Sequence, residues 1–145
     1  MNSLHTIKDL ADTHAVAFTE THCWTEAEIT TLLNSPFVFL SGDSRCFALV
    51  RVVADEAELL TLATHPEYQR KGLATNLMPI WQAAAQSRGA EQAFLEVAAD
   101  NIAALTLYRS QGFAISGRRN EYYARKDGVL VDAVLMQRTF SPLAK

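Results

Sequence analysis

A basic loop that contains glycine lies near the middle of the chain and has the residue types of a phosphate-binding site. It reads QRKGLA at residues 69–74 and follows an apolar segment that Pro66 ends, because proline has no N–H for a strand ladder. The small residues Gly72 and Ala74 allow an anion to approach the backbone. The helix expected next presents unpaired N–H groups at the positive end of its dipole, so we interpret the loop as a site for a diphosphate.

The loop carries neither of the common nucleotide-binding patterns. It lacks G-x-x-x-x-G-K-[ST] and the three glycines of G-x-G-x-x-G. The ligand expected from these residues is therefore a diphosphate carried by some other molecule. The alternative that stays open is a solvent-exposed basic loop that precedes an ordinary helix.

Glu96 is the carboxylate of an apolar segment, AFLEVA at residues 93–98, that is predicted to form a strand. An ionised glutamate buried there without a partner would be costly, so we expect Glu96 to sit at an opening of the sheet or to keep a partner or a water. A carboxylate in apolar surroundings is a good candidate for a general base. The alternative is a glutamate at the solvated end of a strand.

Tyr108 and Asn101 lie seven positions apart on the helix predicted over residues 102–111, which Asn101 can cap. Seven positions are two helical turns, so both side chains can face one ligand. The alternative for Tyr108 is an ordinary tyrosine of the core, which is the usual role of tyrosine in such a helix.

Two motifs together resemble the GNAT superfamily of N-acetyltransferases. Residues 69–74 match its acetyl-CoA motif [QR]-x-x-G-x-[GA]. LEVAADNIAALTLYRSQGF at 95–113 matches the pattern L-E-V-x-x-x-N-x-x-A-x-x-L-Y-x-x-x-G-F of the ribosomal-protein-alanine N-acetyltransferase family at every fixed position. RRNEYY at 118–123 is similar to that family's closing segment, and HCWTE at 22–26 is similar to its Pro-Trp-[ST] stretch, with Cys23 in place of proline.

This resemblance covers essentially the whole chain and implies a role for individual residues. Glu96 would be the general base and Tyr108 the general acid, while Trp24, Tyr122 and Tyr123 would line the acceptor groove. Acetyl-CoA would be bound by Leu62, Ala63, Thr64, Arg70, Lys71, Gly72, Leu73, Ala74, Thr75 and Asn101. No metal is implied.

The implied reaction is direct transfer of an acetyl group from acetyl-CoA to a primary amine. The family implies the N-terminal alanine of a ribosomal protein as the acceptor. Two other interpretations remain: a GNAT enzyme that acetylates a lysine side chain or a small-molecule amine, and a CoA-binding module without turnover. The choice of acceptor depends on loops that the motifs do not specify.

Composition sets limits on the class of protein. The chain has 145 residues, of which 49% are hydrophobic and 20% charged, as expected of one globular domain over residues 1–145. A net charge of -3 argues against a nucleic-acid surface, which needs a basic stripe. The first residues lack the pattern of a signal peptide, and we expect a cytoplasmic protein with reduced cysteines. No metal-ligand spacing occurs among Cys23, Cys46, His5, His14, His22 and His65.

The predicted elements that must position these residues describe a mixed fold. Helices are expected over 7–18, 25–34, 70–88 and 102–111 from apolar spacing and end signals. Strands are expected over 37–40, 46–53, 58–64, 93–97, 113–116 and 129–136. The economical arrangement is an α/β fold of the α+β type, in which helices flank a mixed, mostly antiparallel central sheet. The resemblance implies the GNAT fold.

Overall fold

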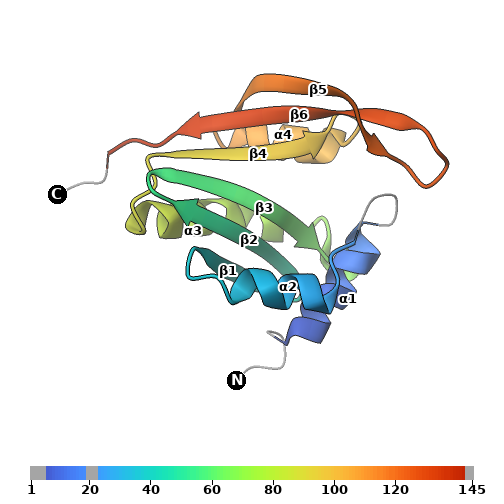
Figure 1. Cartoon of the computed structure of the whole chain (residues 1–145), viewed down its shortest axis with the longest axis horizontal. Helices are drawn as coiled ribbons and strands as arrows, with labels where there is room; N and C mark the ends of the chain where they lie inside the picture. The colour runs from blue at the N-terminus through green and yellow to red at the C-terminus, as the bar shows by residue number, and fades with distance from the viewer. Residues whose placement is uncertain (1–5, 19–22, 143–145) are drawn as a thin grey trace.

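The computed structural model describes residues 6–18 and 23–142, which form four α-helices and a six-stranded sheet (Figure 1). The elements are, in chain order, α1 (Ile7–Ala17), α2 (Glu26–Leu33), β1 (Val38–Asp43), β2 (Cys46–Val53), β3 (Glu56–Thr64), the 3-10 helix η2 (Pro66–Tyr68), α3 (Leu73–Ser87), β4 (Gln92–Ala98), α4 (Ile102–Ser110), β5 (Ala114–Ala124) and β6 (Leu130–Thr139).

The strands lie in the order β1-β2-β3-β4-β6-β5, and every neighbouring pair except β3 and β4 is antiparallel. The predicted mixed, mostly antiparallel sheet is therefore confirmed. α3 connects the two parallel strands, which cannot be joined by a tight turn. The parallel pairing joins only Glu56–Glu58 to Gln92–Phe94, so the two strands share no paired residue beyond Glu58 and Phe94.

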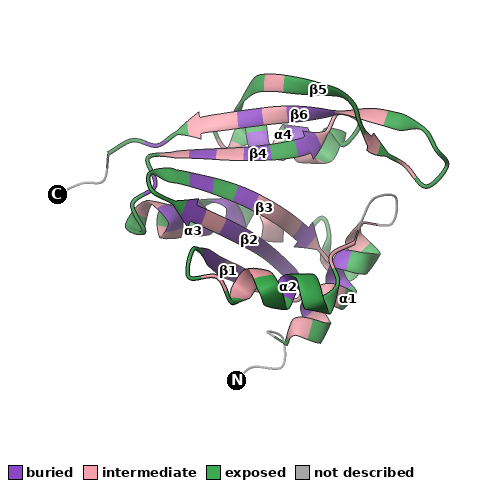
Figure 2. Cartoon of the chain, viewed as in Figure 1, coloured by how far each residue is buried: buried purple, intermediate pink, exposed green. Residues whose placement is uncertain are grey.

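Helices cover both faces of the sheet (Figures 1 and 2). On one face, α3 and α4 bury Trp81 and Leu105 in the larger hydrophobic cluster. On the opposite face, α1 and α2 bury Leu10 and Ile29 against Phe47 of β2. Figure 1 shows α1 and α2 beside β1 to β3 and away from β5. β2 and β3 therefore contribute side chains to both clusters.

Helix ends follow the signals expected from the sequence. Thr25 and Glu28 form a capping box at the start of α2, in which each side chain accepts a 3.1 Å hydrogen bond from the backbone N–H of the other. Asn101 caps α4 through its side-chain oxygen. Gly89 and Gly112, which follow α3 and α4, have φ values of +102° and +92°, a region that favours glycine.

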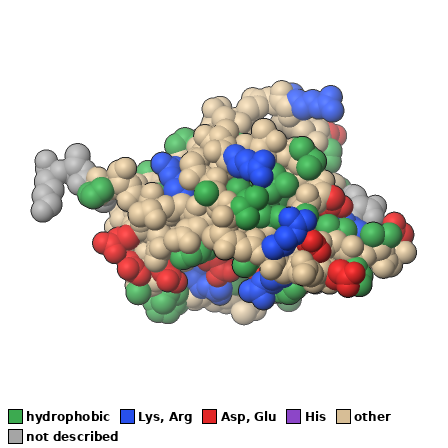
Figure 3. All heavy atoms as spheres, turned by 90° about the horizontal axis from the view of Figure 1, so that it is seen from above, with side chains coloured by type: hydrophobic (Ala, Val, Ile, Leu, Met, Phe, Trp, Pro, Cys, Tyr) green, Lys and Arg blue, Asp and Glu red, His purple; other side chains and the backbone are tan. Residues whose placement is uncertain are grey.

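β5 differs most from its prediction. The sequence predicts a strand over 113–116, whereas the strand extends over Ala114–Ala124 along the edge of the sheet. Nearly all of β5 is exposed (Figure 2), and the face seen in Figure 3 shows basic side chains among hydrophobic ones. An edge strand exposed in this way lacks the apolar alternation by which strands are recognised in a sequence.

Smaller differences occur at the ends of other elements. β1 continues to Asp43, beyond the strand predicted over 37–40, because the hairpin turns only after Asp43 pairs with Cys46. β3 begins at Glu56, and β6 runs over Leu130–Thr139. α3 begins at Leu73, the last residue of its predicted start.

Cys46 is a buried free thiol, and the Sγ of Cys23 donates to Phe18 C=O at 3.0 Å. Within the described ranges, no three His, Cys, Asp or Glu side chains form a group that could hold a metal ion, while His5 and His22 lie outside those ranges. No helix formed by the described residues is long and apolar enough to cross a membrane.

Candidate active site

A cavity of about 530 Å³ opens where β3 and β4 separate, and we call it the β3–β4 cavity. Its walls come from α1, the segment before α2, β3, β4, α4 and β5. The residues singled out in the sequence that line it are Trp24, Leu62, Glu96, Asn101, Tyr108, Tyr122 and Tyr123. Segments that are distant in sequence therefore meet at this cavity, which lies where the parallel pairing between β3 and β4 ends.

A bulge in β3 shapes the floor of the β3–β4 cavity. Leu49 of β2 pairs with Thr61 and the next residue, Val50, pairs with Leu59, so Leu60 has no partner in β2. An extra residue of this kind bends a strand and turns its side chains. Residues 59–62 all line the cavity. Beyond Glu58, the edge of β3 that faces β4 has no ladder partner, which leaves its backbone groups available to a ligand.

Glu96 lies on β4 with its carboxylate at the β3–β4 cavity, and 31% of its side chain is exposed. Its Oε1 accepts an ion-paired hydrogen bond from Arg119 Nε at 2.9 Å. Arg119 belongs to β5, so this contact reaches across β6. The expected opening of the sheet and the expected partner are therefore both present. The surroundings of Glu96 are therefore not purely apolar, because a guanidinium pairs with its carboxylate.

Tyr108 lies on α4 and is buried, with 7% of its surface exposed. Burial raises the pKa of its phenol, and the charge of Cys46 adds to the same shift. Its ring packs edge-on against Phe113 with centroids 6.2 Å apart. Tyr108 therefore belongs to the core and also lines the β3–β4 cavity, as a protonated hydroxyl at neutral pH.

Asn101 has a structural role and remains able to bind a ligand. Its Oδ1 accepts a 3.2 Å hydrogen bond from the Ala104 N–H at the start of α4. Its side-chain NH₂ group is a donor that the cap does not use. Because Asn101 also lines the β3–β4 cavity, this group can donate to a ligand there.

The loop at 69–75, which we call the diphosphate loop, has the backbone geometry of an anion site. Arg70 and Gly72 have φ values of +63° and +78°, and Gly72 caps α3 without a side-chain hydrogen bond. The first amide bonded back to this loop is Asn76 N–H, which donates to Gly72 C=O at 2.9 Å. Within the described part of the chain, the amides of residues 70–75 have no backbone acceptor. These N–H groups can therefore converge on a ligand.

The diphosphate loop does not line the β3–β4 cavity, and neither do Ala63 and Thr64. Ala63 is buried in the α1–α2 core, and Thr64 lies within hydrogen-bonding distance of Cys46 Sγ at 3.3 Å. Gln69 donates from its side chain to Thr64 C=O at 3.4 Å, which ties the loop to the end of β3. A ligand that uses both regions must therefore be long and must follow β3.

A second bulge places Tyr122 and Tyr123 at the opposite wall of the β3–β4 cavity. Arg119 pairs with Ala133 and Tyr123 with Val131, so residues 120–122 face Asp132 alone. Asp132 accepts hydrogen bonds from Glu121 N–H at 2.8 Å and from Arg118 Nε at 2.7 Å. These two donors, the backbone one first, lower the pKa of Asp132. The bulge allows two consecutive tyrosines to line one cavity, which a regular strand would point to opposite faces.

Other residues at the β3–β4 cavity were not singled out from the sequence. They are His14, Phe18, Thr61 and Arg125, the last paired with Asp100. His14 had a signal, because it occupies the apolar stripe of the first predicted helix. The ion pairs of Arg125 with Asp100 and of Arg119 with Glu96 had no signal, since the partners lie about two dozen residues earlier and are brought together by the fold.

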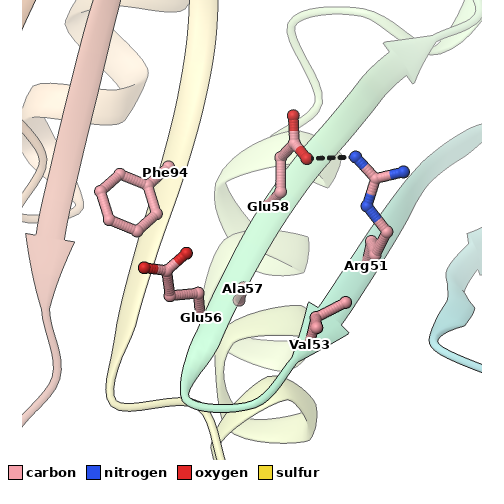
Figure 4. Close-up of a pocket in the computed structure, with 6 residues that line it drawn as sticks. All are labelled: Arg51, Val53, Glu56, Ala57, Glu58 and Phe94. Atoms are coloured by element: carbon pink, nitrogen blue, oxygen red, sulfur yellow. Dashed lines mark hydrogen bonds and ion pairs between the residues drawn. The ribbon is translucent and has the colours of Figure 1, made fainter.

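A second hollow lies beside the β3–β4 cavity on the same sheet (Figure 4). Its lining residues come from β2, β3 and β4, and Glu58 lines both spaces. Arg51 Nη2 donates to Glu58 Oε1 at 2.5 Å, and both side chains remain about half exposed. No residue of this hollow was predicted to bind a ligand.

Known proteins share this architecture. The ribosomal protein bS18-alanine N-acetyltransferase of Escherichia coli (strain K12) is 41% identical over 96 residues, which are 66% of this chain and 64% of that protein. The match thus spans just under two thirds of the relative's length. The crystal structure of the ribosomal-protein-S18-alanine N-acetyltransferase from Escherichia coli has a TM-score of 0.85 at 30% identity, covering 99% of this chain and 95% of that one.

A more distant structure shows the fold alone. The NatC complex bound to Gag peptide and CoA has a TM-score of 0.77 at 19% identity, covering 97% of this chain and 93% of that chain. The family model described as the acetyltransferase (GNAT) family matches residues 7–113. The chain therefore belongs to the acetyltransferase (GNAT) family.

Proposed function

We propose that this protein transfers the acetyl group of acetyl-CoA to an N-terminal α-amine, and that the acceptor is the N-terminal alanine of a ribosomal protein. The observation that carries the proposal is the β3–β4 cavity, which brings Glu96, Asn101 and Tyr108 to one place. The acceptor follows from the relatives, since the protein from Escherichia coli is named for acting on an alanine of ribosomal protein bS18. Such an acceptor places the reaction in the cytoplasm.

The residues present fit acetyl-CoA as the donor. The unbonded amides of residues 70–75 would bind the diphosphate, assisted by the charges of Arg70 and Lys71. The unpaired edge of β3 over Leu62–Thr64 would pair with the amide-containing pantetheine arm, as an added strand does. The NH₂ group of Asn101 would donate to the arm near the thioester. The loop lies beyond the end of β3, the unpaired edge belongs to β3, and Asn101 lies at the start of α4, so a long ligand is needed to reach all three.

Glu96 would receive the proton of the acceptor amine, directly or through a water. An α-amine has a pKa of about 8 and is mostly protonated at neutral pH, so a base is useful. The ion pair with Arg119 holds the carboxylate in place. Positioning and electrostatic attraction of the amine would therefore contribute along with proton removal.

The neutral amine then forms a bond to the thioester carbonyl carbon, and the C–S bond breaks as the tetrahedral intermediate collapses. The carbonyl oxygen needs a donor, for which backbone N–H groups near Ala63 or Thr64 are candidates. Tyr108 would give its proton to the departing thiolate, and the proton that the nitrogen loses as the amide forms would restore the phenol, yielding CoA thiol and the N-acetylated acceptor. No covalent enzyme intermediate is required, so neither Cys23 nor Cys46 acts as a nucleophile.

Trp24, Tyr122 and Tyr123 would line the route of the acceptor peptide. They lie on two sides of the β3–β4 cavity, Trp24 before α2 and the two tyrosines in the β5 bulge. Aromatic side chains suit this role because they offer rigid apolar contact together with a polar group. A peptide held between them would point its N-terminus toward Glu96.

The experiment that tests the proposal compares two matched peptides with acetyl-CoA. One begins with a free alanine and has no lysine, and the other has a blocked N-terminus and one internal lysine. We expect acetylation of the first at its N-terminal residue, located by tandem mass spectrometry. Acetylation of the lysine peptide alone would favour side-chain acetylation. Saturable binding of CoA without any acetylated product would favour a non-catalytic CoA-binding module.

A further inference from the structure

His14 is a buried histidine of α1 that the mechanism above does not use. Only 2% of its surface is exposed, although it lines the β3–β4 cavity. Its Nε2 lies 3.0 Å from Thr61 Oγ1 of β3, and its Nδ1 accepts a 3.2 Å hydrogen bond from the Trp24 N–H. The imidazole of His14 therefore links the segment before α2, at Trp24, to β3, at Thr61.

These contacts define the protonation state of the ring. A backbone N–H can only donate, so Nδ1 of His14 must be the unprotonated nitrogen. The proton of the neutral imidazole is then on Nε2, which donates it to the Thr61 hydroxyl. His14 is thus the neutral Nε2–H tautomer.

The two partners of His14 are themselves at the β3–β4 cavity. Trp24 lies just before Thr25, the N-cap of α2, so its N–H is outside the helix and needs another acceptor. Thr61 follows Leu60, the extra residue of the β3 bulge. His14 also stacks on the Trp24 ring at 5.7 Å and on the Phe18 ring at 4.4 Å between centroids.

We propose that His14 is a positioning residue for the acceptor: it ties the segment that carries Trp24 to β3 at Thr61 and so fixes the acceptor wall of the β3–β4 cavity. This inference rests on the proposed function, because it assigns to Trp24 a contact with the acceptor peptide. The hydrogen bonds of His14 to Trp24 and Thr61 lie on the acceptor side of the β3–β4 cavity, whereas the diphosphate loop does not line this cavity. Loss of His14 should therefore weaken acceptor binding and leave acetyl-CoA binding unchanged.

The test uses two substitutions of the same residue. His14→Phe keeps a ring of similar size but removes both hydrogen bonds, leaving the Trp24 N–H without its acceptor. His14→Asn places an amide oxygen near the position of Nδ1 and can keep the bond from Trp24. We expect the KM for the alanine peptide to rise about tenfold in His14→Phe, with a smaller rise in His14→Asn, because a lost buried hydrogen bond has an effect of this size. The KM for acetyl-CoA should not change.

Thr13→Val is the matched control. Thr13 is the neighbouring buried polar residue of α1, also 2% exposed, and its hydroxyl donates to Ser44 C=O in the β1–β2 turn, which is not part of the β3–β4 cavity. This variant should lose stability as His14→Phe does but keep the wild-type KM for the peptide. Equal increases of that KM in both variants at equal loss of Tm would overturn the proposal.

A second readout does not depend on turnover. The chain has two tryptophans, and Trp81 is fully buried, so acrylamide quenching of fluorescence reports mainly on Trp24. Quenching should increase in His14→Phe and in Thr61→Val but not in Thr13→Val. Unchanged quenching in both His14→Phe and Thr61→Val would refute the positioning role of His14, even if the wild-type protein acetylates the peptide. Increased quenching in these two variants, together with no acetylation by the wild-type protein, would support the role of His14 in positioning Trp24 and would reject the proposed function.

Discussion

Arg119 positions the carboxylate of Glu96. Its Nε lies 2.9 Å from Glu96 Oε1 and forms an ion pair with it. An incoming ammonium group would share that carboxylate and would be held there before it loses its proton. In this view Glu96 collects and orients the amine as well as accepting its proton.

Replacing Glu96 by glutamine tests this role. We expect Glu96→Gln to lower kcat by about 100-fold at pH 7, which is the lower range for loss of a general base. The loss should shrink above about pH 8, because a growing fraction of α-amine is then neutral without help. Initial rates at saturating acetyl-CoA from pH 6.5 to 9.5 measure it, with Glu91→Gln as the control outside the cavity. The same loss at every pH would argue against proton transfer to Glu96.

Tyr108 offers a second test at the scale of one residue. Its buried phenol has a raised pKa, so it stays protonated through the alkaline range in which an ordinary tyrosine, with a pKa of about 10, begins to ionise. We expect Tyr108→Phe to lower kcat about tenfold, since a thiolate leaves readily and needs only modest assistance. The ratio of wild-type to variant kcat should be constant from pH 7 to 9.5. A ratio that falls toward one with rising pH in this range would show that Tyr108 ionises earlier than its burial allows.

At the scale of elements, the diphosphate loop depends on backbone shape. A Cβ at Gly72 would meet no atom within 4 Å, yet the φ of +78° is costly for alanine by about 1–2 kcal/mol. An effect of replacing Gly72 by alanine would therefore come from the strained backbone conformation, because the added Cβ causes no clash in the free protein. The amides that follow Gly72 are those that would bind the diphosphate.

The corresponding prediction is that Gly72→Ala raises the Kd for acetyl-CoA about tenfold, as expected from that conformational cost. Binding of S-acetylpantetheine, which lacks the diphosphate, should not change. Gly128→Ala is the matched control, because Gly128 has a φ of +87° and open space around it but lies in the β5–β6 turn. Isothermal titration with both ligands measures the difference. Weakening of both ligands alike would place the diphosphate elsewhere.

Local signals made the four helices, most of their ends and the presence of the six strands predictable. The capping box at Thr25, the cap at Asn101 and the glycine after α4 are encoded within a few residues of the ends they define. The two bulges are not encoded in this way, because Leu60 and residues 120–122 are extra only in relation to a neighbouring strand. The contacts that Glu96 and His14 make with their partners were not predictable from local signals either, because only tertiary packing brings these residues together.

At the scale of the whole molecule, the site exists because the sheet divides. Three paired residues join β3 to β4, and beyond them each strand is held by other neighbours, β3 by β2 and β4 by β6. Two hydrophobic cores on opposite faces fix the strands in this separated position. The cavity between them is thus part of the folded structure and not a consequence of ligand binding.

Under the proposed function, both substrates must meet in the β3–β4 cavity, with the donor along β3 and the acceptor between Trp24 and the β5 bulge. A bisubstrate analogue, in which CoA is joined through an acetyl bridge to the α-amine of an alanine peptide, measures this directly. Because one molecule then fills two adjoining sites, we predict a Kd at least 100-fold below that of CoA, with competition against both substrates. A Kd equal to that of CoA, with no competition against the peptide, would contradict the account.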